Sequence, residues 1–234
     1  MHQALRSGYA RWRAGELGRI TEGIEEALIL ELAGPLEGRR VLDVGCGDGT
    51  FAIAAAERGA RPTGVDRSGA ALAAARHRAD ARGAPIALCR ADASQLPFHD
   101  DTFDVVMAVT LLCLVEGAAD VLREMARVVA PGGLVVIGEL GCWSGWAAWR
   151  RIRGWLGHPV WRYAAFHDAR GLARLVRASG LEVERIDGAV HYPPIGLAAR
   201  LLAPYDRALG VRFAAFLTLA ARCPTETAEE SCTT

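Results

Sequence analysis

The stretch VLDVGCGDGTF, Val41–Phe51, decides the fold of this chain. Its apolar first half predicts a short strand, and the alanine-rich residues 49–58 predict a helix. Between them, Gly45, Gly47 and Gly49 have the spacing G-x-G-x-G. Because glycine has no Cβ, the backbone N–H groups of such a turn can approach a ligand closely. The stretch therefore predicts a strand–turn–helix unit that binds a ligand at the turn.

The glycine spacing also indicates the kind of ligand. The dinucleotide fingerprint G-x-G-x-x-G/A requires glycine or alanine at position 50, where this chain has Thr50. Asp43 precedes the first glycine by two residues. Its carboxylate would repel a pyrophosphate but would attract an ammonium group, directly or through water. The loop thus favours an amino-acid-like, cationic ligand over NAD.

Segments typical of strands and helices alternate along the chain. Strands are expected at 39–45, 60–66, 84–92, 102–109, 133–140 and 181–192, and helices at 16–33, 49–58, 69–82, 117–129, 168–179 and 195–210. Ser68 is expected to N-cap its helix, and Pro204 to kink the last one. Residues 211–223 are interpreted as a final strand, although a helix also fits them. Short apolar strands between amphipathic helices predict a parallel sheet covered on both faces.

Two further aspartates end predicted strands. Asp66 ends the second strand, where a carboxylate can accept hydrogen bonds from both hydroxyls of a ribose. Asp92 ends the third, where it can accept one from an adenine amino group. A single aspartate after a strand is also a common helix cap. Together with Asp43 and the glycine spacing, however, these acids predict one ligand site at the carboxyl edge of the sheet.

These motifs resemble those of the class I S-adenosylmethionine-dependent methyltransferases. VLDVGCGDG (41–49) resembles the first motif of that family, VD (65–66) the acidic end of its second strand, and ADASQLPF (91–98) its third motif. Residues 103–139 resemble its fourth strand, the following helix and the PGG turn into strand five. The resemblance implies an α/β fold with a Rossmann-like, doubly wound, seven-stranded sheet. Its strand order would be 3-2-1-4-5-7-6, with the last strand antiparallel and helical cap insertions.

The resemblance also implies the cofactor, S-adenosyl-L-methionine, and the residues around it. The three glycines would line its methionine part, Asp66 would hold the ribose, and Asp92 with Ala93 the adenine, while Thr110 would flank the sulfonium. The implied cofactor site comprises Tyr9, Arg19, Asp43, Gly45, Cys46, Gly47, Gly49, Asp66, Arg67, Asp92, Ala93 and Thr110.

Composition excludes several classes of protein. The 234 residues are 51% hydrophobic and carry 27 basic and 27 acidic side chains, so a polyanion partner such as nucleic acid is not expected. VTLL (109–112) stands where nucleic-acid amino-group methyltransferases have an Asn/Asp-Pro-Pro-aromatic motif. The six cysteines form no C-x-x-C pair, no metal site is expected, and the start shows no apolar signal core. We therefore expect a cytoplasmic protein that acts on a small molecule; its oligomeric state is not legible from the sequence.

The expected domain organisation is simple. Residues 1–36 would form an N-terminal helical segment, 37–223 the methyltransferase domain, and 224–234 a disordered tail. The cap at 141–166 and a lid helix at 195–210 would be insertions in that domain.

Candidates for a general base lie mostly in the last third of the chain. They are His167, His191 and Tyr192, with Glu139 at the end of strand five. A histidine has a suitable pKa but is often only a surface or helix-end residue, and Glu139 can instead face solvent or cap a turn. Cys113, with Cys142 near it, could bind a soft metal or metalloid, although a small buried apolar side chain is the favoured interpretation of Cys113.

The segment 141–166 carries five of the six tryptophans and four arginines. Trp143, Trp146 and Trp149 have helical spacing and are expected on one face. Three interpretations remain open: the indoles seal the cap onto the core, they line an apolar acceptor pocket with arginines that grip a carboxylate or phosphate, or the helix contacts a membrane surface.

The sequence therefore predicts methyl transfer to a small apolar or aromatic acceptor. Two alternatives remain: a non-catalytic protein that binds the cofactor and a partner, and an NAD-dependent oxidoreductase, which Thr50 and Asp43 disfavour.

Overall fold

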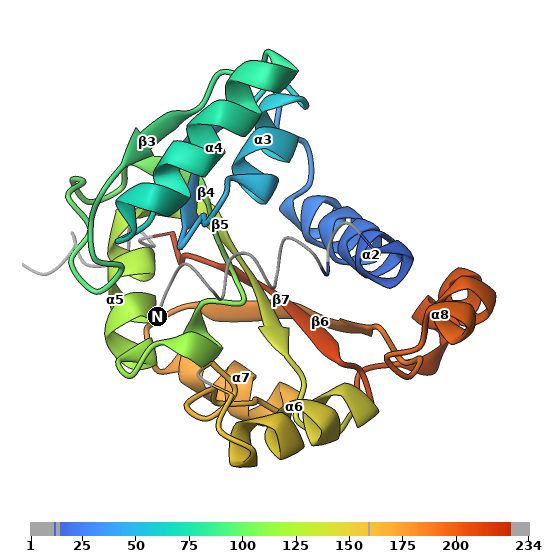
Figure 1. Ribbon diagram of the computed structural model, residues 1–234. Coiled ribbons are helices and arrows are strands. Elements are labelled where there is room, and N and C mark those ends of the chain that lie inside the picture. The colour runs from blue at the N-terminus through green and yellow to red at the C-terminus, as the bar shows by residue number, and fades with distance from the viewer. Residues whose placement is uncertain (1–11, 13–14, 159, 226–234) are drawn as a thin grey trace, which may run out of the picture.

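The computed structural model describes residue 12 and residues 15–158 and 160–225. Seven strands form one sheet in the order β3-β2-β1-β4-β5-β7-β6. β1 to β5 are parallel to one another, and β7 is antiparallel to both β5 and β6 (Figure 1). This order and the antiparallel seventh strand confirm the predicted Rossmann-like fold.

The elements follow one another as the sequence predicts. The strands are β1 Arg40–Val44, β2 Arg61–Val65, β3 Ala87–Cys89, β4 Phe103–Val109, β5 Val129–Leu140, β6 Glu182–Ala189 and β7 Phe216–Arg222. The helices are α2 Glu16–Ala33, α3 Thr50–Ala56, α4 Gly69–Arg82, α5 Ala118–Val128, α6 Gly145–Trp155, α7 Ala169–Arg177 and α8 Gly196–Leu202, with short 3-10 turns η1 Leu112–Leu114 and η2 Ala203–Leu209. Residues 211–223 contain a strand and not a helix, and the predicted kink at Pro204 is the change from α8 to η2.

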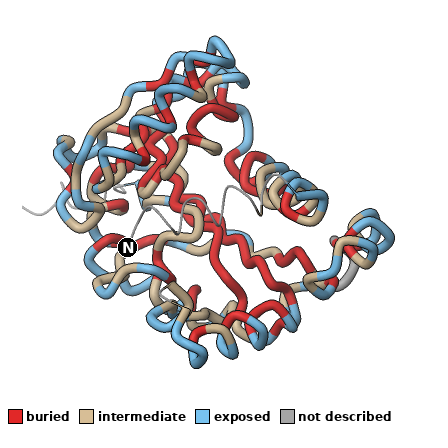
Figure 2. The backbone as a smooth tube through the Cα atoms, in the orientation of Figure 1, coloured by how far each residue is buried: buried red, intermediate tan, exposed pale blue. Residues whose placement is uncertain are grey.

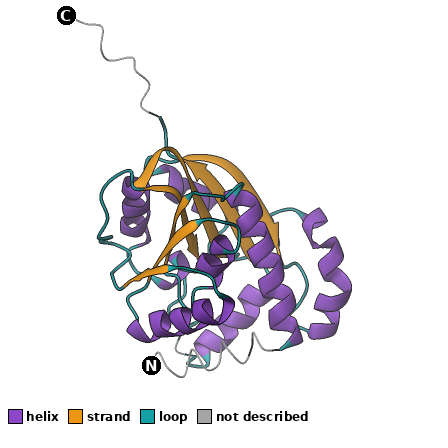
Figure 3. Ribbon diagram, turned by 90° about the horizontal axis from the view of Figure 1, so that it is seen from above, coloured by secondary structure: helices purple, strands orange, loops and turns teal. Residues whose placement is uncertain are grey.

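The sheet is buried on both faces because apolar side chains alternate between them. On β4, Met107 packs in the same cluster as α2, whereas Val106 packs in the cluster that contains α5 and α7. Helices accordingly lie on either side of the sheet, and its central strands are largely buried (Figures 2 and 3). Because β1 to β5 run in parallel, the loops that follow them gather at one edge of the sheet.

Three local predictions were wrong. β3 covers only Ala87–Cys89 of the expected 84–92, because it is the edge strand and Pro85 has no N–H to donate. β5 begins at Val129 and includes Pro131, and its pairing with β4 is irregular between Phe103 and Val105. Ser68 occupies the N-cap position of α4 but makes no side-chain cap bond.

The tryptophan stripe is also corrected. Oγ of Ser144 accepts from the amide of Ala147, so α6 begins at Gly145 and Trp143 lies outside the helix. Trp146 is buried, whereas Trp149 and Trp143 are exposed. The three indoles therefore do not share a face.

Candidate cofactor site

The glycine loop after β1 is the centre of the site. Gly45, Gly47 and Gly49 all adopt left-handed backbone conformations, with φ of 72°, 56° and 81°. A Cβ on Gly45 would lie 2.7 Å from Cδ1 of Leu111, and one on Gly49 would lie 3.0 Å from Cβ of Ala75. At Gly47 a Cβ would meet no atom within 4 Å. Two glycines are thus needed for packing, and the third leaves the backbone open to a ligand.

Asp43 lies on β1, directly before this loop. Its side chain is buried, with 1% of the residue exposed, and Oδ2 accepts from the amide of Ala52 at 3.1 Å. Burial, with a smaller contribution from the nearby Asp66 and Asp48, raises the pKa of this carboxyl to about 7, although the hydrogen bond from Ala52 lowers it in part. The sequence predicts that Asp43 meets an ammonium directly or through water. In the structure Oδ2 of this carboxylate points to the start of α3, where it fixes the helix to the strand. The contact with an ammonium group stays a prediction.

Asp66 joins the glycine loop to the loop after β2. Its Oδ2 accepts from the amide of Gly47 at 3.1 Å, and its Oδ1 accepts from the amide of Ser68 at 2.8 Å. Gly45 and Cys46 both donate their amides to the carbonyl of Val65, at 2.7 and 2.9 Å. The carboxylate is half-buried at the carboxyl ends of β1 and β2, where the sequence predicts it.

Asp92 stands further along the same edge. It is exposed, and its Oδ1 accepts from both the amide and the hydroxyl of Ser94, at 2.9 and 2.7 Å, which lowers its pKa. Ala93 beside it is half-buried. The carbonyl of Arg67 accepts from Nε of Arg90 at 3.1 Å. This bond ties the loop of Asp66 to the segment that leads to Asp92, so the two acids belong to one surface.

Thr110 leaves β4 in an unusual conformation. Its φ is 51°, in the left-handed region that a threonine rarely adopts. Its amide donates to the carbonyl of Gly138 at 2.7 Å, and its hydroxyl donates to the carbonyl of Val109 at 2.8 Å. The next residue, Leu111, is the one that packs over Gly45. The turn after β4 is therefore held against the glycine loop, and such local strain is common at binding sites.

Glu139 caps the 3-10 turn η1, which is one of the alternatives that the sequence left open for it. The residue is fully buried, and its carboxylate accepts from the amides of Leu112 and Cys113 at 2.7 and 3.1 Å. Burial raises its pKa to about 7, although these hydrogen bonds lower it in part. The carboxylate is not exposed to solvent, and its two hydrogen bonds fix the backbone that follows Thr110. Its position inside an otherwise apolar strand is the one sequence signal that favours a buried cap over an exposed residue.

The structure separates the three candidate bases. Oη of Tyr192 shares a 3.0 Å hydrogen bond with Oγ1 of Thr21, and burial raises its pKa to about 12. The ring of His191 lies between Oδ1 of Asp206, 3.1 Å from Nδ1, and the carbonyl of Gly210, 2.7 Å from Nε2. Both side chains are committed to the fold, so neither prediction is supported.

His167 differs from the other two. Its Nε2 is buried and has no hydrogen-bond partner within the described part of the chain. Burial lowers the pKa of its ring, which keeps the imidazole neutral and able to accept a proton. The side chain lines a hollow of about 690 Å³ at the carboxyl end of β5, together with Cys142, Trp143, Arg212 and Phe213.

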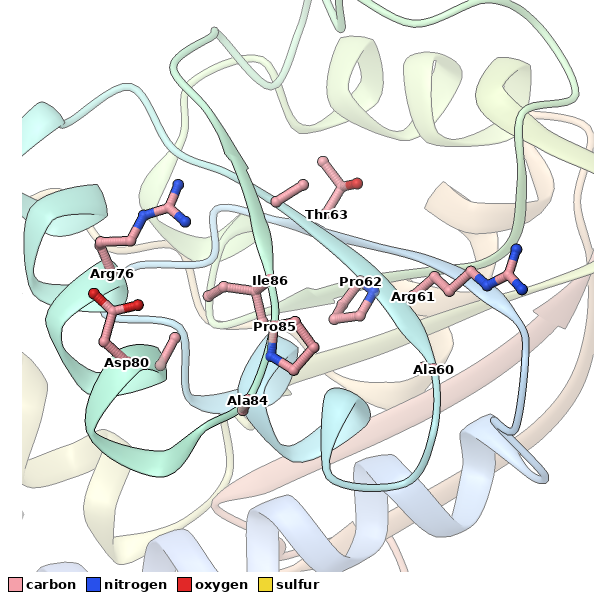
Figure 4. A pocket seen from close by; sticks show the side chains of 11 residues that line it. Ala60, Arg61, Pro62, Thr63, Arg76, Asp80, Ala84, Pro85 and Ile86 are labelled. Carbon is pink, nitrogen blue, oxygen red and sulfur yellow. The ribbon is translucent and has the colours of Figure 1, made fainter.

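A second hollow, of about 640 Å³, lies at the other edge of the sheet (Figure 4). Arg61, Pro62 and Ile86 line it at the amino ends of β2 and β3. Because the glycine loop follows the carboxyl end of β1, this hollow is not part of the site.

The remaining predicted residues are placed as follows. Arg19 lies exposed on α2, and Tyr9 lies outside the described residues. Cys113 is a buried thiol whose pKa is raised by burial, which supports its interpretation as a small apolar side chain. Cys46, predicted at the cofactor, is likewise buried, and burial raises the pKa of its thiol. Among the described residues, no group of His, Cys, Asp and Glu could hold a metal ion.

The sheet order places the protein in the Rossmann-like class, whose ligands bind at this edge of the sheet. The methyltransferase-domain family matches residues 42–137. The chain is 40% identical over 113 residues to a ubiquinone biosynthesis O-methyltransferase of Alkalilimnicola ehrlichii, covering 48% of this chain and 46% of that protein. It is 34% identical over 186 residues to the enzyme of the same name from Thiobacillus denitrificans, covering 74% of this chain and 76% of that one.

A solved structure from Thermotoga maritima has the same fold. It is described as a SAM-dependent methyltransferase, possible histamine N-methyltransferase; its TM-score is 0.71 at 20% identity, over 93% of this chain and 95% of that one. This chain belongs to the family of class I S-adenosylmethionine-dependent methyltransferases, and its cofactor is S-adenosylmethionine. The residues present fit that cofactor, because the space beside Gly47 is open and Asp66 lies against it.

Proposed function

We propose that this protein transfers a methyl group from S-adenosylmethionine to an oxygen of a small aromatic or apolar molecule. The glycines of the loop would face the methionine part of the cofactor, with Asp66 at the ribose and Asp92 and Ala93 at the adenine. When bound, the cofactor supplies an electrophilic methyl group. The protein has to align the acceptor, exclude water and receive a proton.

The position of His167 carries this proposal. The amide of Thr110 bonds to the carbonyl of Gly138, and the amide of His167 bonds to the carbonyl of Leu140, two residues further along β5. Gly141 and His167 also form a parallel bridge. With a rise of about 3.3 Å per residue, the backbone of His167 continues the line of β4 about 7 Å beyond Thr110. A base at this distance leaves room for an acceptor between itself and the residue that flanks the sulfonium.

The side chains around His167 support an aromatic or apolar acceptor. Trp143 and Phe213 line the hollow and expose 66% and 59% of their surface, so apolar area is available to a ligand. The name O-methyltransferase of the two relatives supports an oxygen acceptor. His167 would take the hydroxyl proton on Nε2, the atom that has no partner within the described part of the chain.

A methyl-transfer assay tests the proposal. The protein is incubated with S-adenosylmethionine that carries a labelled methyl group and with separate sets of phenols, aliphatic alcohols, amines and oligonucleotides. We expect labelled ethers from the phenols. Cofactor binding with no turnover on any set would favour a non-catalytic binding protein, and labelling of amines or oligonucleotides alone would contradict the oxygen acceptor.

A further inference from the structure

Helix α6 has two faces of different character. Trp146, Ala147 and Arg150 are buried on its inner face. The outer face consists of Trp149, Ile152, Trp155 and Leu156, which expose 41%, 50%, 84% and 82% of their surface. These four residues follow the spacing of one helical stripe that continues into the turn after α6. So much apolar surface in one stripe on a folded protein marks an interaction site.

The inner face holds the helix firmly on the protein. Nε1 of Trp146 donates to the carbonyl of Tyr192 at 2.8 Å. The guanidinium of Arg150 lies 5.2 Å from the ring centres of both Trp146 and Trp161. The outer face is therefore presented by a helix that is already folded and anchored, and docking requires no ordering of the chain.

The segment that carries the outer face has charged side chains of one sign only. The chain as a whole has 27 basic and 27 acidic side chains, yet residues 141–166 include four arginines and neither aspartate nor glutamate. Arg153 stacks over Trp149 at 4.8 Å, and Arg162 over Tyr163 at 5.5 Å. The cations thus lie beside the apolar rings, as at the interface of a bilayer, where indoles enter the acyl boundary and guanidinium groups reach the headgroups.

From the apolar stripe and this charge we propose that the outer face of α6 docks on the surface of an anionic lipid bilayer. A single amphipathic helix with cations beside its apolar stripe suits a planar, negatively charged surface. α6 follows directly after Cys142 and Trp143, which line the hollow of His167. Docking would therefore bring the hollow close to molecules dissolved in the membrane. This inference depends on the surface of α6 and not on the proposed acceptor.

Vesicle co-sedimentation of the full chain tests it. The probes are vesicles of equal parts phosphatidylcholine and phosphatidylglycerol, compared with vesicles of phosphatidylcholine alone. We expect binding to the anionic vesicles only, weakened by salt, with a blue shift of tryptophan fluorescence. No binding to the anionic vesicles, or equal binding to both kinds, would overturn the proposal.

Matched variants assign the contact to α6. The double variant Trp149→Ser/Trp155→Ser should bind more than about tenfold more weakly, because two indoles lose their burial in lipid. Trp149→Phe/Trp155→Phe should retain most of the affinity. Arg153→Gln/Arg162→Gln should weaken binding by about fivefold per arginine. Arg82→Gln/Arg123→Gln, which removes the same charge from α4 and α5, should change it less than about twofold.

Two further results would overturn the proposal. Undiminished vesicle binding by the serine variant, with an unchanged circular dichroism spectrum, would overturn the proposal. So would concentration-dependent dimers in sedimentation velocity that this variant abolishes, since a second copy of the chain would then cover the outer face.

Discussion

The backbone amide of Gly47 donates a hydrogen bond to Oδ2 of Asp66 at 3.1 Å. The glycine belongs to the loop after β1 and the aspartate to the loop after β2, so the bond joins two elements that are separate in the sequence. Oδ1 of the same carboxylate accepts from Ser68. The proposed ribose site is therefore built in advance by the protein's own contacts, and less free energy would be needed to order it on binding.

Replacement of Asp66 by alanine should weaken cofactor binding. Loss of hydrogen bonds to a charged group costs about 1–3 kcal/mol, or about 5- to 150-fold in affinity. Calorimetric titration with S-adenosylhomocysteine measures the change. Asp104→Ala is the matched control, because that carboxylate bonds to Arg40 at the opposite edge of the sheet. Unchanged affinity in Asp66→Ala would refute the ribose assignment.

Gly45→Ala and Gly47→Ala should have different effects. Both place a Cβ on a left-handed residue, which costs about 1–2 kcal/mol of stability. At position 45 the new Cβ also collides with Leu111, so this variant should unfold at lower denaturant concentration. At position 47 it enters open space, so this variant should stay folded but lose cofactor affinity. Equal affinity of Gly47→Ala and the unaltered protein would exclude close approach of a ligand there.

Glu139 should make stability depend on pH. Its carboxyl holds a proton up to about pH 7 in the folded protein but only to about 4.5 when unfolded. Between these values the folded state binds more protons, so the free energy of unfolding falls as pH rises. The shift corresponds to about 3 kcal/mol. Urea unfolding at several pH values should show a smaller fall in Glu139→Gln.

Asp43, whose pKa is also raised to about 7, would keep part of the slope in that variant. The exposed Glu116 offers a control substitution to glutamine. A pH dependence that is identical in Glu139→Gln and in the unaltered protein would show that Glu139 is not buried as described.

His167→Ala should lower kcat for a phenolic acceptor by about 100-fold or more, the usual contribution of a general base. Its affinity for the cofactor and its stability should change little, because Nε2 has no hydrogen-bond partner within the described part of the chain. His191→Ala should do the reverse and destabilise the fold by about 1–3 kcal/mol, since it removes contacts to Asp206 and Gly210. Equal kcat values for His167→Ala and the unaltered protein would exclude His167 as the base.

The sequence predicted the parallel core well because periodicity and glycine turns are local signals. α2 at Glu16–Ala33 and α4 at Gly69–Arg82 agree with their predicted bounds, and Asp168 caps α7 through its bond to Gly171. The glycine loop and Asp66 were also found, because a turn that needs positive φ can be recognised from glycines alone.

Features that depend on distant partners were not predictable in the same way. Tyr192 resembles a catalytic residue until Thr21, far away in the sequence, is seen to bond with it. For Glu139 the sequence left a base, a solvent-exposed residue and a turn cap as alternatives, and only the amides of Leu112 and Cys113 around its carboxylate identify the cap. Trp143 does not share the predicted stripe, because Ser144 caps the helix and α6 begins only after it.

A crystal structure with S-adenosylhomocysteine bound tests the central claim most directly. The account predicts the ribose hydroxyls on the carboxylate of Asp66, the adenine beside Asp92 and Ala93, and the homocysteine backbone along Gly45 and Gly47. A nucleoside in the hollow beside Phe213, or in reversed orientation with the adenine at the glycines, would contradict it.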